Sequence, residues 1–193
     1  REAAYCVDRD SLERRVRVAD LPLSYEENGR RQAFWMEASF ARRIDGWLGW
    51  WREHSGRRVD EVRSFGTWID GAGECNSWHH AGRAFDLTSL RLDGGAIASA
   101  RMDRILEVGE TERAGFLRAY WQLTASLHLH FRWVLTANYD DLHRNHIHVD
   151  DGAWTGGPAF SPDSPSQVKD LQSICTELFG VRVPSTGEFD RQT

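Results

Sequence analysis

Residues 77–86 have the sequence SWHHAGRAFD, and residues 143–148 have the sequence HRNHIH. Both segments combine histidines with polar neighbours, although they lie far apart in the chain. Zinc in proteins takes about four ligands in a tetrahedral array, and a hydrolytic site typically uses three protein ligands and leaves the fourth position for water. His79, Asp86 and His148 could supply those three ligands. The two segments therefore predict a metal site assembled from distant parts of the chain.

The local pattern indicates how these side chains are directed. Asp86 has apolar neighbours on both sides, as in a buried strand, and side chains alternate along a strand. Asp86 can therefore point into a cleft while its neighbours face the core. His79 precedes it on a loop. His146 and His148 are two residues apart and share one strand face, so one can bind metal while the other contacts substrate or orients a ligand.

The pattern on either side of these segments predicts the fold class. Apolar residues recur with a 3.6-residue period over residues 32–54, which predicts a tryptophan-rich helix packed on the core. Residues 1–20 are mixed and charged, and residues 21–29 are rich in turn formers. The other expected elements are helices at 96–108 and 111–127 and strands at 57–65, 84–88, 130–136 and 147–150. Together they predict an α+β fold with a small antiparallel sheet flanked by helices.

A change in composition predicts the domain organisation. Glycine, proline and serine are concentrated in residues 156–166, which indicates a linker. We therefore expect a main domain at residues 1–155 and a short C-terminal segment at residues 167–193, helical over 167–179. This last segment is too short to bury a core alone. It either packs on the first domain or begins an incomplete module.

Length and charge narrow the functional classes. The chain has 193 residues, of which 40% are hydrophobic, and a formal net charge of -5. These values suit one well-formed core. No basic block is present, so nucleic acid is not an expected partner. No apolar run approaches the roughly 20 residues that span a bilayer, and no signal-peptide pattern is visible, so we expect no membrane span. The sequence makes no prediction of the oligomeric state.

The three cysteines, Cys6, Cys75 and Cys175, are too few for a disulfide scaffold and too scattered for a structural zinc knuckle. If the protein is exported, Cys6 with Cys75 is the preferred disulfide. The alternative is three unpaired cysteines that act as small core residues. Cys175 stays single in either case.

The pattern S-x-H-x-x-G-x-A-x-D at residues 77–86, followed far downstream by H-x-H at residues 146–148, resembles the zinc D-Ala-D-Ala carboxypeptidase family of peptidoglycan peptidases. That family shares its fold with hedgehog signalling domains. Residues 131–140, FRWVLTANYD, are similar to the extensin-like C-terminal branch of the superfamily. The resemblance covers residues 57–152. It implies a hedgehog/DD-peptidase-like fold, with Zn²⁺ bound by His79, Asp86 and His148.

The resemblance also implies roles for two further residues. Arg63 lies sixteen residues before His79, where the family has an arginine that binds a substrate carboxylate or polarises the scissile carbonyl. A solvated charge on a strand is the alternative for Arg63. His146 corresponds to the first histidine of the H-x-H motif, which is thought to stabilise the transition state. His80 and His143 are expected to orient other residues or to be exposed.

Asn145 departs from the family pattern, which places a catalytic Asp or Glu three residues before the last histidine ligand. An amide cannot accept a proton from water, and loss of a general base lowers a rate by about 10²- to 10⁴-fold. Three explanations stay open. Another carboxylate (Asp140, Asp141 or Glu74) reaches the water, the chain is an inactive form, or it has become a binding protein.

The C-terminal residues 168–172 and 187–193 resemble the opening of a small three-helix peptidoglycan-binding domain. We therefore expect residues 167–193 to be an incomplete peptidoglycan-binding-like module. A wall-binding module beside a wall-cutting site implies peptidoglycan stem peptides as partners. It also implies a secreted or cell-envelope location, with a signal peptide already removed.

These expectations define one main functional hypothesis and two rivals. The main hypothesis is a zinc metallopeptidase, a hydrolase acting on cell-wall stem peptides as a D,D-carboxypeptidase or endopeptidase through a zinc-activated water. The first rival is a catalytically silent, zinc-containing cell-wall binding protein, which Asn145 favours. The second is a hedgehog-like signalling or adhesion module, which rests on the shared fold alone.

Overall fold

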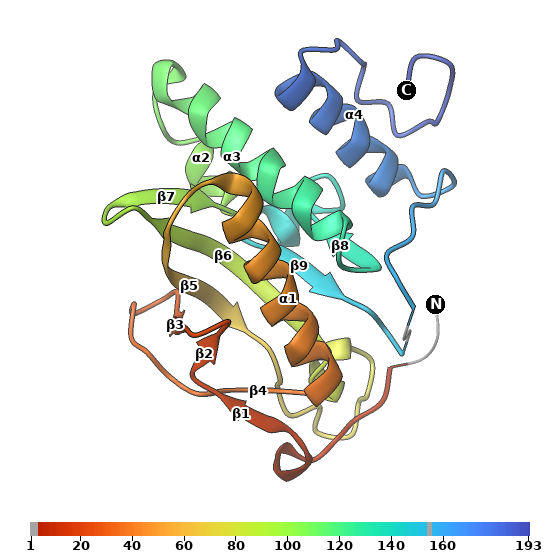
Figure 1. The fold of residues 1–193 in the computed structure, drawn as a ribbon. Helices are drawn as coiled ribbons and strands as arrows, with labels where there is room; N and C mark the ends of the chain where they lie inside the picture. The colour runs from red at the N-terminus through yellow and green to blue at the C-terminus, as the bar shows by residue number, and fades with distance from the viewer. Residues whose placement is uncertain (1–3, 154–155) are drawn as a thin grey trace.

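Strand β6 (Ala84–Leu92), which carries Asp86, is the central strand of the molecule. The computed structural model in Figure 1 describes residues 4–153 and 156–193. Its other strands are β1 (Glu13–Arg15), β2 (Arg17–Val18), β3 (Leu21–Tyr25), β4 (Phe34–Met36), β5 (Val59–Gly66), β7 (Ala96–Ser99), β8 (Trp133–Leu135) and β9 (Ile147–Asp150). Its helices are α1 (Ala38–Ser55), α2 (Met102–Ile105), α3 (Glu110–His128) and α4 (Pro165–Phe179), with 3-10 turns η1 (Arg9–Ser11), η2 (Trp78–Ala81) and η3 (Asp141–Arg144).

Within the described residues, seven strands form one sheet in the order β2-β3-β5-β6-β9-β8, and β7 pairs with the second half of β6. Strands β1 and β4 form a separate pair. The strand pairs of the large sheet are antiparallel except for β3 and β5, which run parallel. Parallel neighbours need a long crossover connection, and α1 lies in that connection. The predicted α+β fold is confirmed, with a mixed sheet in place of a purely antiparallel one.

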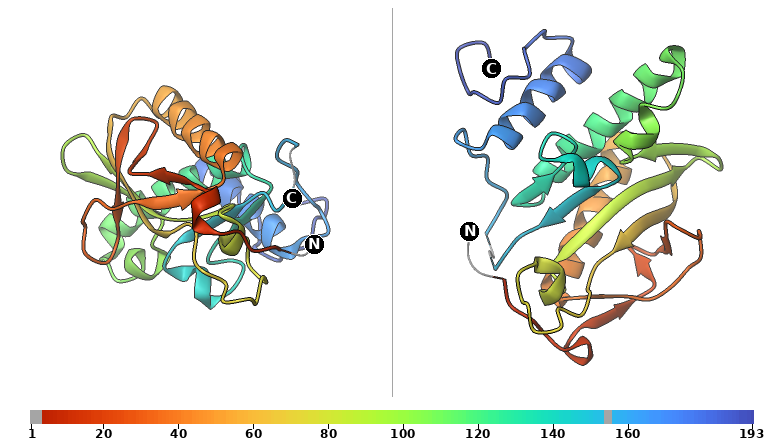
Figure 2. Two further views of the ribbon diagram at one scale, coloured as in Figure 1. Left: turned by 90° about the horizontal axis from the view of Figure 1, so that it is seen from below. Right: turned by 180° about the vertical axis from the view of Figure 1, so that it is seen from behind.

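The hydrophobic core lies between the sheet and the two long helices α1 and α3, which Figure 1 shows on the same side of the strands. Phe85 and Leu87 of β6 and Trp47 of α1 are fully buried there. Asp86, between the two apolar residues of β6, faces the other side of the sheet. Figure 2, in the view from behind, shows β5, β6 and β9 in front of α1. The functional residues of β6 therefore lie on the face away from the core.

A β-bulge changes the direction of side chains halfway along β6. Ser64 pairs with Leu87, but the preceding residue Arg63 pairs with Ser89, so β6 contains one extra residue at this point. Leu87 and Leu90 both face the core in consequence, although they are an odd number of residues apart. Asp86 and Ser89 both face away from it.

Two of the predicted helices were wrong in part. The helix predicted at residues 32–54 begins at Ala38, because Glu37 caps it by accepting hydrogen bonds from Ser39 N and Phe40 N. The helix predicted at 96–108 is strand β7 followed by the short α2. Asp93 and Gly94 both have positive φ (50° and 76°), the geometry of a tight hairpin turn, and this turn folds residues 96–99 back onto β6.

Strands β1 to β3 lie in residues that the sequence analysis treated as charged or turn-rich. Strand β1 is largely exposed and β2 has only two residues, so neither shows a clear alternation of apolar and polar residues. Strand β3 contains Pro22, which is unusual inside a strand. The other predicted elements exist, with ends that differ by a few residues. The helix predicted at 111–127 is α3, and the strand predicted at 147–150 is β9.

Helix α4 packs against α3, and its residues Ile174 and Leu178 contact the main core. Asp170 of α4 is buried and accepts hydrogen bonds from Thr136 Oγ1 (2.7 Å) and Asn138 Nδ2 (2.9 Å). The C-terminal helix is thus bound to the segment that follows β8. Residues 154 and 155, next to the predicted domain boundary, lie outside the described residues.

Cys6 and Cys75 form a disulfide with a Cα–Cα distance of 5.0 Å, and Cys175 is free. The preferred pairing of the sequence analysis is confirmed. The bond ties the N-terminal segment to the loop that leads into η2. In the described part of the chain, no helix combines the length and the apolar character needed to cross a membrane.

Candidate metal centre

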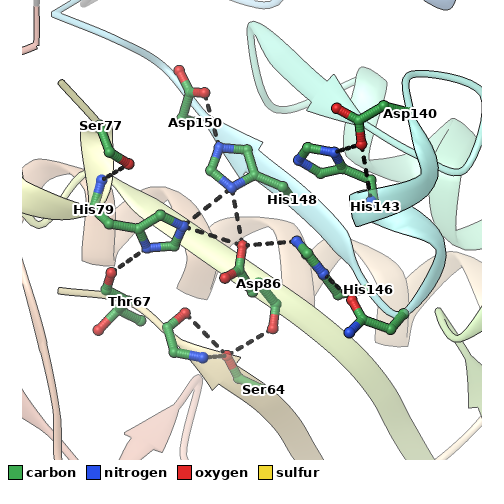
Figure 3. A network of polar contacts seen from close by, with 12 residues as sticks. Ser64, Thr67, Ser77, His79, Asp86, Asp140, His143, His146, His148 and Asp150 are labelled. Carbon is green, nitrogen blue, oxygen red and sulfur yellow. Dashed lines mark hydrogen bonds and ion pairs between the residues drawn. The ribbon is translucent and has the colours of Figure 1, made fainter. Parts of the chain in front are cut away.

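The three predicted metal ligands meet at one point on the open face of the sheet. His148 Nδ1 lies 2.9 Å from Asp86 Oδ1 and 3.2 Å from His79 Nε2, and His79 Nε2 lies 3.2 Å from Asp86 Oδ1. Figure 3 shows the three side chains converging from η2, β6 and β9. Two residues that are 62 positions apart in the chain, Asp86 and His148, are cross-strand partners in the register of β6 and β9. The pairing of these strands therefore assembles the site.

His79 is held in place by the turn η2. Ser77 caps the turn by accepting a hydrogen bond from His79 N, and the ring Nδ1 of His79 is hydrogen-bonded to Thr67 O. Gly82 ends the turn with φ of 65°, and a Cβ there would lie 2.7 Å from a methyl carbon of Leu12. Glycine is required at this position by both the left-handed backbone and the close contact. The second ring nitrogen of His79 is thereby left to face Asp86.

His148 is oriented by a second carboxylate. Its Nε2 lies 3.0 Å from Asp150 Oδ2, two residues along β9, and Asp150 is buried. A ligand histidine commonly donates its other ring N–H to a carboxylate or a carbonyl, which fixes the ring and its tautomer. His79, bonded to Thr67 O, and His148, bonded to Asp150, both follow this arrangement.

The charges in the cluster stabilise one another. Burial lowers the pKa of His148, but hydrogen bonds with Asp150 and Asp86 outweigh that effect and raise it to about 9. For Asp86, burial raises the pKa, but hydrogen bonds with His148 and His79 outweigh it and hold the pKa well below its usual range. Asp86 and Asp150 therefore favour a proton on His148 in the metal-free protein. A metal cation would replace that proton, so protons and metal compete for the site.

The donor set fits zinc. Two imidazole nitrogens and one carboxylate oxygen are typical zinc ligands, with bond lengths of about 2.0–2.2 Å. Donor atoms around a tetrahedral ion at that distance are separated by roughly 3.3 Å. The observed separations of 2.9–3.2 Å are close to this value. The other ring nitrogens already have partners, as a preorganised site requires.

His146 lies beside this cluster without being part of the predicted triad. Its Nε2 is 3.4 Å from Asp86 Oδ1, and its Nδ1 donates to Asn145 Oδ1 at 2.6 Å. Burial lowers the pKa of His146 to about 4, so the ring is neutral at pH 7. Asn145, at the position expected to be acidic, thus holds a histidine ring through its side-chain oxygen.

His143 is more closely involved than the sequence indicated. Its ring centroid lies 5.1 Å from that of His146 and 5.9 Å from that of His148. Asp140 Oδ1 accepts a hydrogen bond from His143 Nδ1 at 2.6 Å and also caps η3 through His143 N. The sequence does contain a signal for this arrangement. Asp140 lies three residues before His143, the spacing of an N-cap residue that bonds the third residue of a helical turn.

The metal-binding pocket is an open cavity of about 720 Å³. Its walls include Trp78, Tyr139 and Leu142 in addition to the histidines and Asp86. A second group of potential ligands, His143, His146 and His148, also lies within metal-binding range. The two groups share His148. Of these two groups, the predicted one includes a carboxylate and residues from both β6 and β9.

The remaining predicted residues lie elsewhere. Arg63 does not line the metal-binding pocket; its Nε pairs with Glu61 at 3.1 Å, and its side chain lines a separate cavity. Asp141 has a 95% exposed side chain beside Arg144, and Glu74 is exposed outside the pocket wall. Of the three carboxylates considered as substitutes for an acidic residue 145, only Asp140 is connected to the cluster, through His143. His80 is buried.

The fold and the site define an α+β protein with a preformed His/Asp cluster that could hold a metal ion, in an open pocket. The chain belongs to the extensin-like protein C-terminus family, whose model matches residues 12–157. No curated protein matches this chain. The matched residues include both segments of the metal centre and end before α4.

Proposed function

We propose that the protein is a zinc-dependent peptidoglycan peptidase that hydrolyses an amide bond in cell-wall stem peptides, as a D,D-carboxypeptidase or endopeptidase. The observation that carries this proposal is the His79–Asp86–His148 cluster, in which Thr67 O and Asp150 orient the two histidines before any metal arrives. When bound, zinc supplies a Lewis acid that polarises a carbonyl and acidifies water. The resemblance of residues 57–152 to zinc D-Ala-D-Ala carboxypeptidases supports the choice of reaction.

We assign the proton-accepting role to His143 because Asn145 cannot fill it. The hydrogen bond from His143 Nδ1 to Asp140 leaves Nε2 as the acceptor atom. Burial raises the pKa of Asp140, but hydrogen bonds from His143 outweigh it and keep this pKa below its usual value. The carboxylate therefore stays ionised and stabilises a proton that His143 accepts. We assign contact with the reacting carbonyl to His146, whose Nε2 lies 3.4 Å from Asp86 Oδ1.

Asn145 favours a second candidate function, a catalytically silent, zinc-containing protein that binds the cell wall. In this case the metal centre would be structural or would hold a wall peptide without cleaving it. The resemblance of residues 167–193 to a peptidoglycan-binding module supports wall binding in both candidates. Disulfides persist in oxidising compartments, so the Cys6–Cys75 bond supports a secreted or cell-envelope location.

The test is mass-spectrometric analysis of muropeptides after purified peptidoglycan is incubated with the zinc-loaded protein. His148→Ala, which removes a ligand, is the matched control. New zinc-dependent products that are missing from the control would establish the peptidase and identify the bond. An unchanged profile, with stoichiometric zinc and measurable wall binding, would reject the peptidase and leave the silent binder.

A further inference from the structure

The face of the sheet that carries Asp86 continues past the metal centre to a second cavity. The bulge in β6 places Ser89 and Arg91 on the same face as Asp86, while Leu90 and Leu92 face the core. Arg63 pairs with Ser89 across β5 and β6 and also lies on this outer face. The outer face of two neighbouring strands therefore connects the two cavities.

The second cavity has a volume of about 240 Å³ and is rich in arginine. Arg63, Arg91, Arg101 and Arg104 line it, together with one acidic residue, Glu26. We refer to these five residues and the space between them as the arginine pocket. Because arginine presents a fixed positive charge and several N–H donors, such a lining suits an anion with two oxygens.

The arginines differ in how far their charge is already neutralised. Arg101 makes a two-point ion pair with Asp103 (2.9 and 2.7 Å) and lies near Glu26. Arg104 pairs with Glu107, but both side chains are 64% exposed, so this pair holds the arginine only weakly. Arg63 pairs with Glu61 through Nε alone.

Arg91 is the exception. Within residues 4–153 and 156–193, its guanidinium has no hydrogen bond, ion pair or ring contact, although the residue is only partly exposed. Its cross-strand neighbours are Glu61 on β5 and Ile97 on β7. Glu61 is occupied by Ser24 and Arg63, so Arg91 keeps its donors for another acceptor. Arg91 is therefore the arginine of this pocket whose charge no group among the described residues neutralises.

Phe65 joins the arginine pocket to the metal centre. Its ring lies edge-on to His146, with 6.1 Å between centroids, and the guanidinium of Arg101 lies 5.3 Å from the centre of the same ring. Phe65 therefore contacts one residue of the metal centre, His146, and one residue of the arginine pocket, Arg101.

We propose that the arginine pocket is a substrate-binding subsite for a free carboxylate on the peptide whose amide lies at the metal centre, with Arg91 as the main contact. This inference rests on the proposed function. Arg91 lies five positions after Asp86 on β6, which corresponds to on the order of 16 Å along a strand. The Arg91 side chain can cover part of that distance, so about three extended residues cover the rest. The substrate class is thus an acidic peptide whose carboxylate lies several residues from the scissile bond.

The test measures binding without hydrolysis, so that it does not depend on the reaction. The full-length protein in EDTA is titrated with a stem pentapeptide that has a free α-carboxylate on its D-Glu residue, and with the same peptide carrying an α-carboxamide there. Affinities come from NMR titrations at fixed ionic strength, with the Nε–H signal of Arg91 as a local probe. We expect the acid to bind about tenfold more tightly than the amide, because hydrogen bonds to a charged group are the stronger ones.

Arg91→Gln removes the charge and should abolish the tenfold preference, whereas Arg14→Gln, an exposed arginine on β1, should keep it. Equal binding of acid and amide by the wild-type protein would overturn the subsite. So would an unchanged preference in Arg91→Gln. A preference for the acid that depends on Arg91, combined with no cleavage of peptidoglycan, would sustain the subsite and reject the peptidase. The two proposals therefore fail separately.

Discussion

The two sides of the metal-binding pocket are built in different ways. His79, Asp86 and His148 come from a turn and two buried strands, and the two histidines are held by Thr67 and Asp150. The opposite side is the exposed turn η3 and the residues that follow it, where Leu142 is 79% exposed. The predicted ligands thus belong to a buried strand pair and the turn beside it, whereas His143 and Asn145 lie on an exposed loop. In the proposed peptidase, a substitution on this loop can alter catalysis without disturbing the metal centre.

The largest effect on zinc affinity should come from substitutions on the buried side of the pocket, which carries the predicted ligands. We expect His148→Ala to weaken zinc binding by about a thousandfold or more, since even residues that only orient ligands account for about 10- to 100-fold. His143→Ala should retain stoichiometric zinc, because His143 belongs to the loop. Zinc titration with a competing chelator measures both. Loss of zinc in both variants would assign the metal to the His143–His146–His148 group, which shares His148.

The disulfide tests whether the turn η2 depends on its covalent link. The bond joins residues 69 positions apart, and the loop-entropy relation gives a stabilisation of about 4 kcal/mol for a loop of this size. We expect Cys6→Ala combined with Cys75→Ala to lower the free energy of unfolding by about that amount. Urea denaturation measures it, with Cys175→Ala as the control. A loss below about 1 kcal/mol would mean that the reduced chain holds η2 equally well.

Asn145→Asp tests the exposed side of the pocket, by comparing its effect on zinc affinity with its effect on the rate of hydrolysis. Zinc affinity and hydrolysis of a stem peptide should both change little, because His143 already accepts the proton, whereas a rise of about 10² or more would make residue 145 the missing base. Steady-state kinetics with zinc-loaded protein test this. No change in rate, with His143→Ala inactive, would show that the Asp140–His143 pair already does the work.

The smallest effect concerns Glu37, which connects α1 to the end of η2. Its N–H donates to Gly82 O, and its carboxylate accepts from Arg83 and from the first N–H groups of α1. Burial raises the pKa of Glu37, but the hydrogen bonds from Ser39 outweigh it, so the pKa lies below the usual 4.5. A lowered carboxyl pKa stabilises the fold above pH 4.5, and the stabilisation is lost as the pH falls through the lower value.

Glu37→Gln should therefore lower the free energy of unfolding by about 1 kcal/mol at pH 7, and the difference should shrink below pH 4.5. Glu53→Gln, an exposed glutamate on α1, is the control and should have little effect at either pH. Urea denaturation at several pH values measures both. A difference that stays constant from pH 7 to pH 3 would show that the charge of Glu37 is not responsible.

The ligands of the metal centre could be predicted because their information is local. The face on which each side chain lies follows from the alternation around Asp86 and from the two-residue spacing of His146 and His148. The pairing of β6 with β9 then brings Asp86 and His148 together. The role of His143 could not be predicted with them, since it depends on how η3 turns after Asp140. Strand β7 was missed because its short apolar pattern also fits a helix, and only the Asp93–Gly94 turn decides between them.

The contacts of Asp170 indicate which residues the domain needs in order to fold as one cooperative unit. The family match ends at residue 157, yet this α4 carboxylate satisfies Thr136 and Asn138 in the segment that leads to His143. A fragment ending at 157 would expose the apolar side of α3 and leave both donors without their acceptor, which destabilises buried polar groups. The protease-resistant unit should therefore extend through residue 179. Recombinant fragments intended for zinc or substrate measurements need to include it.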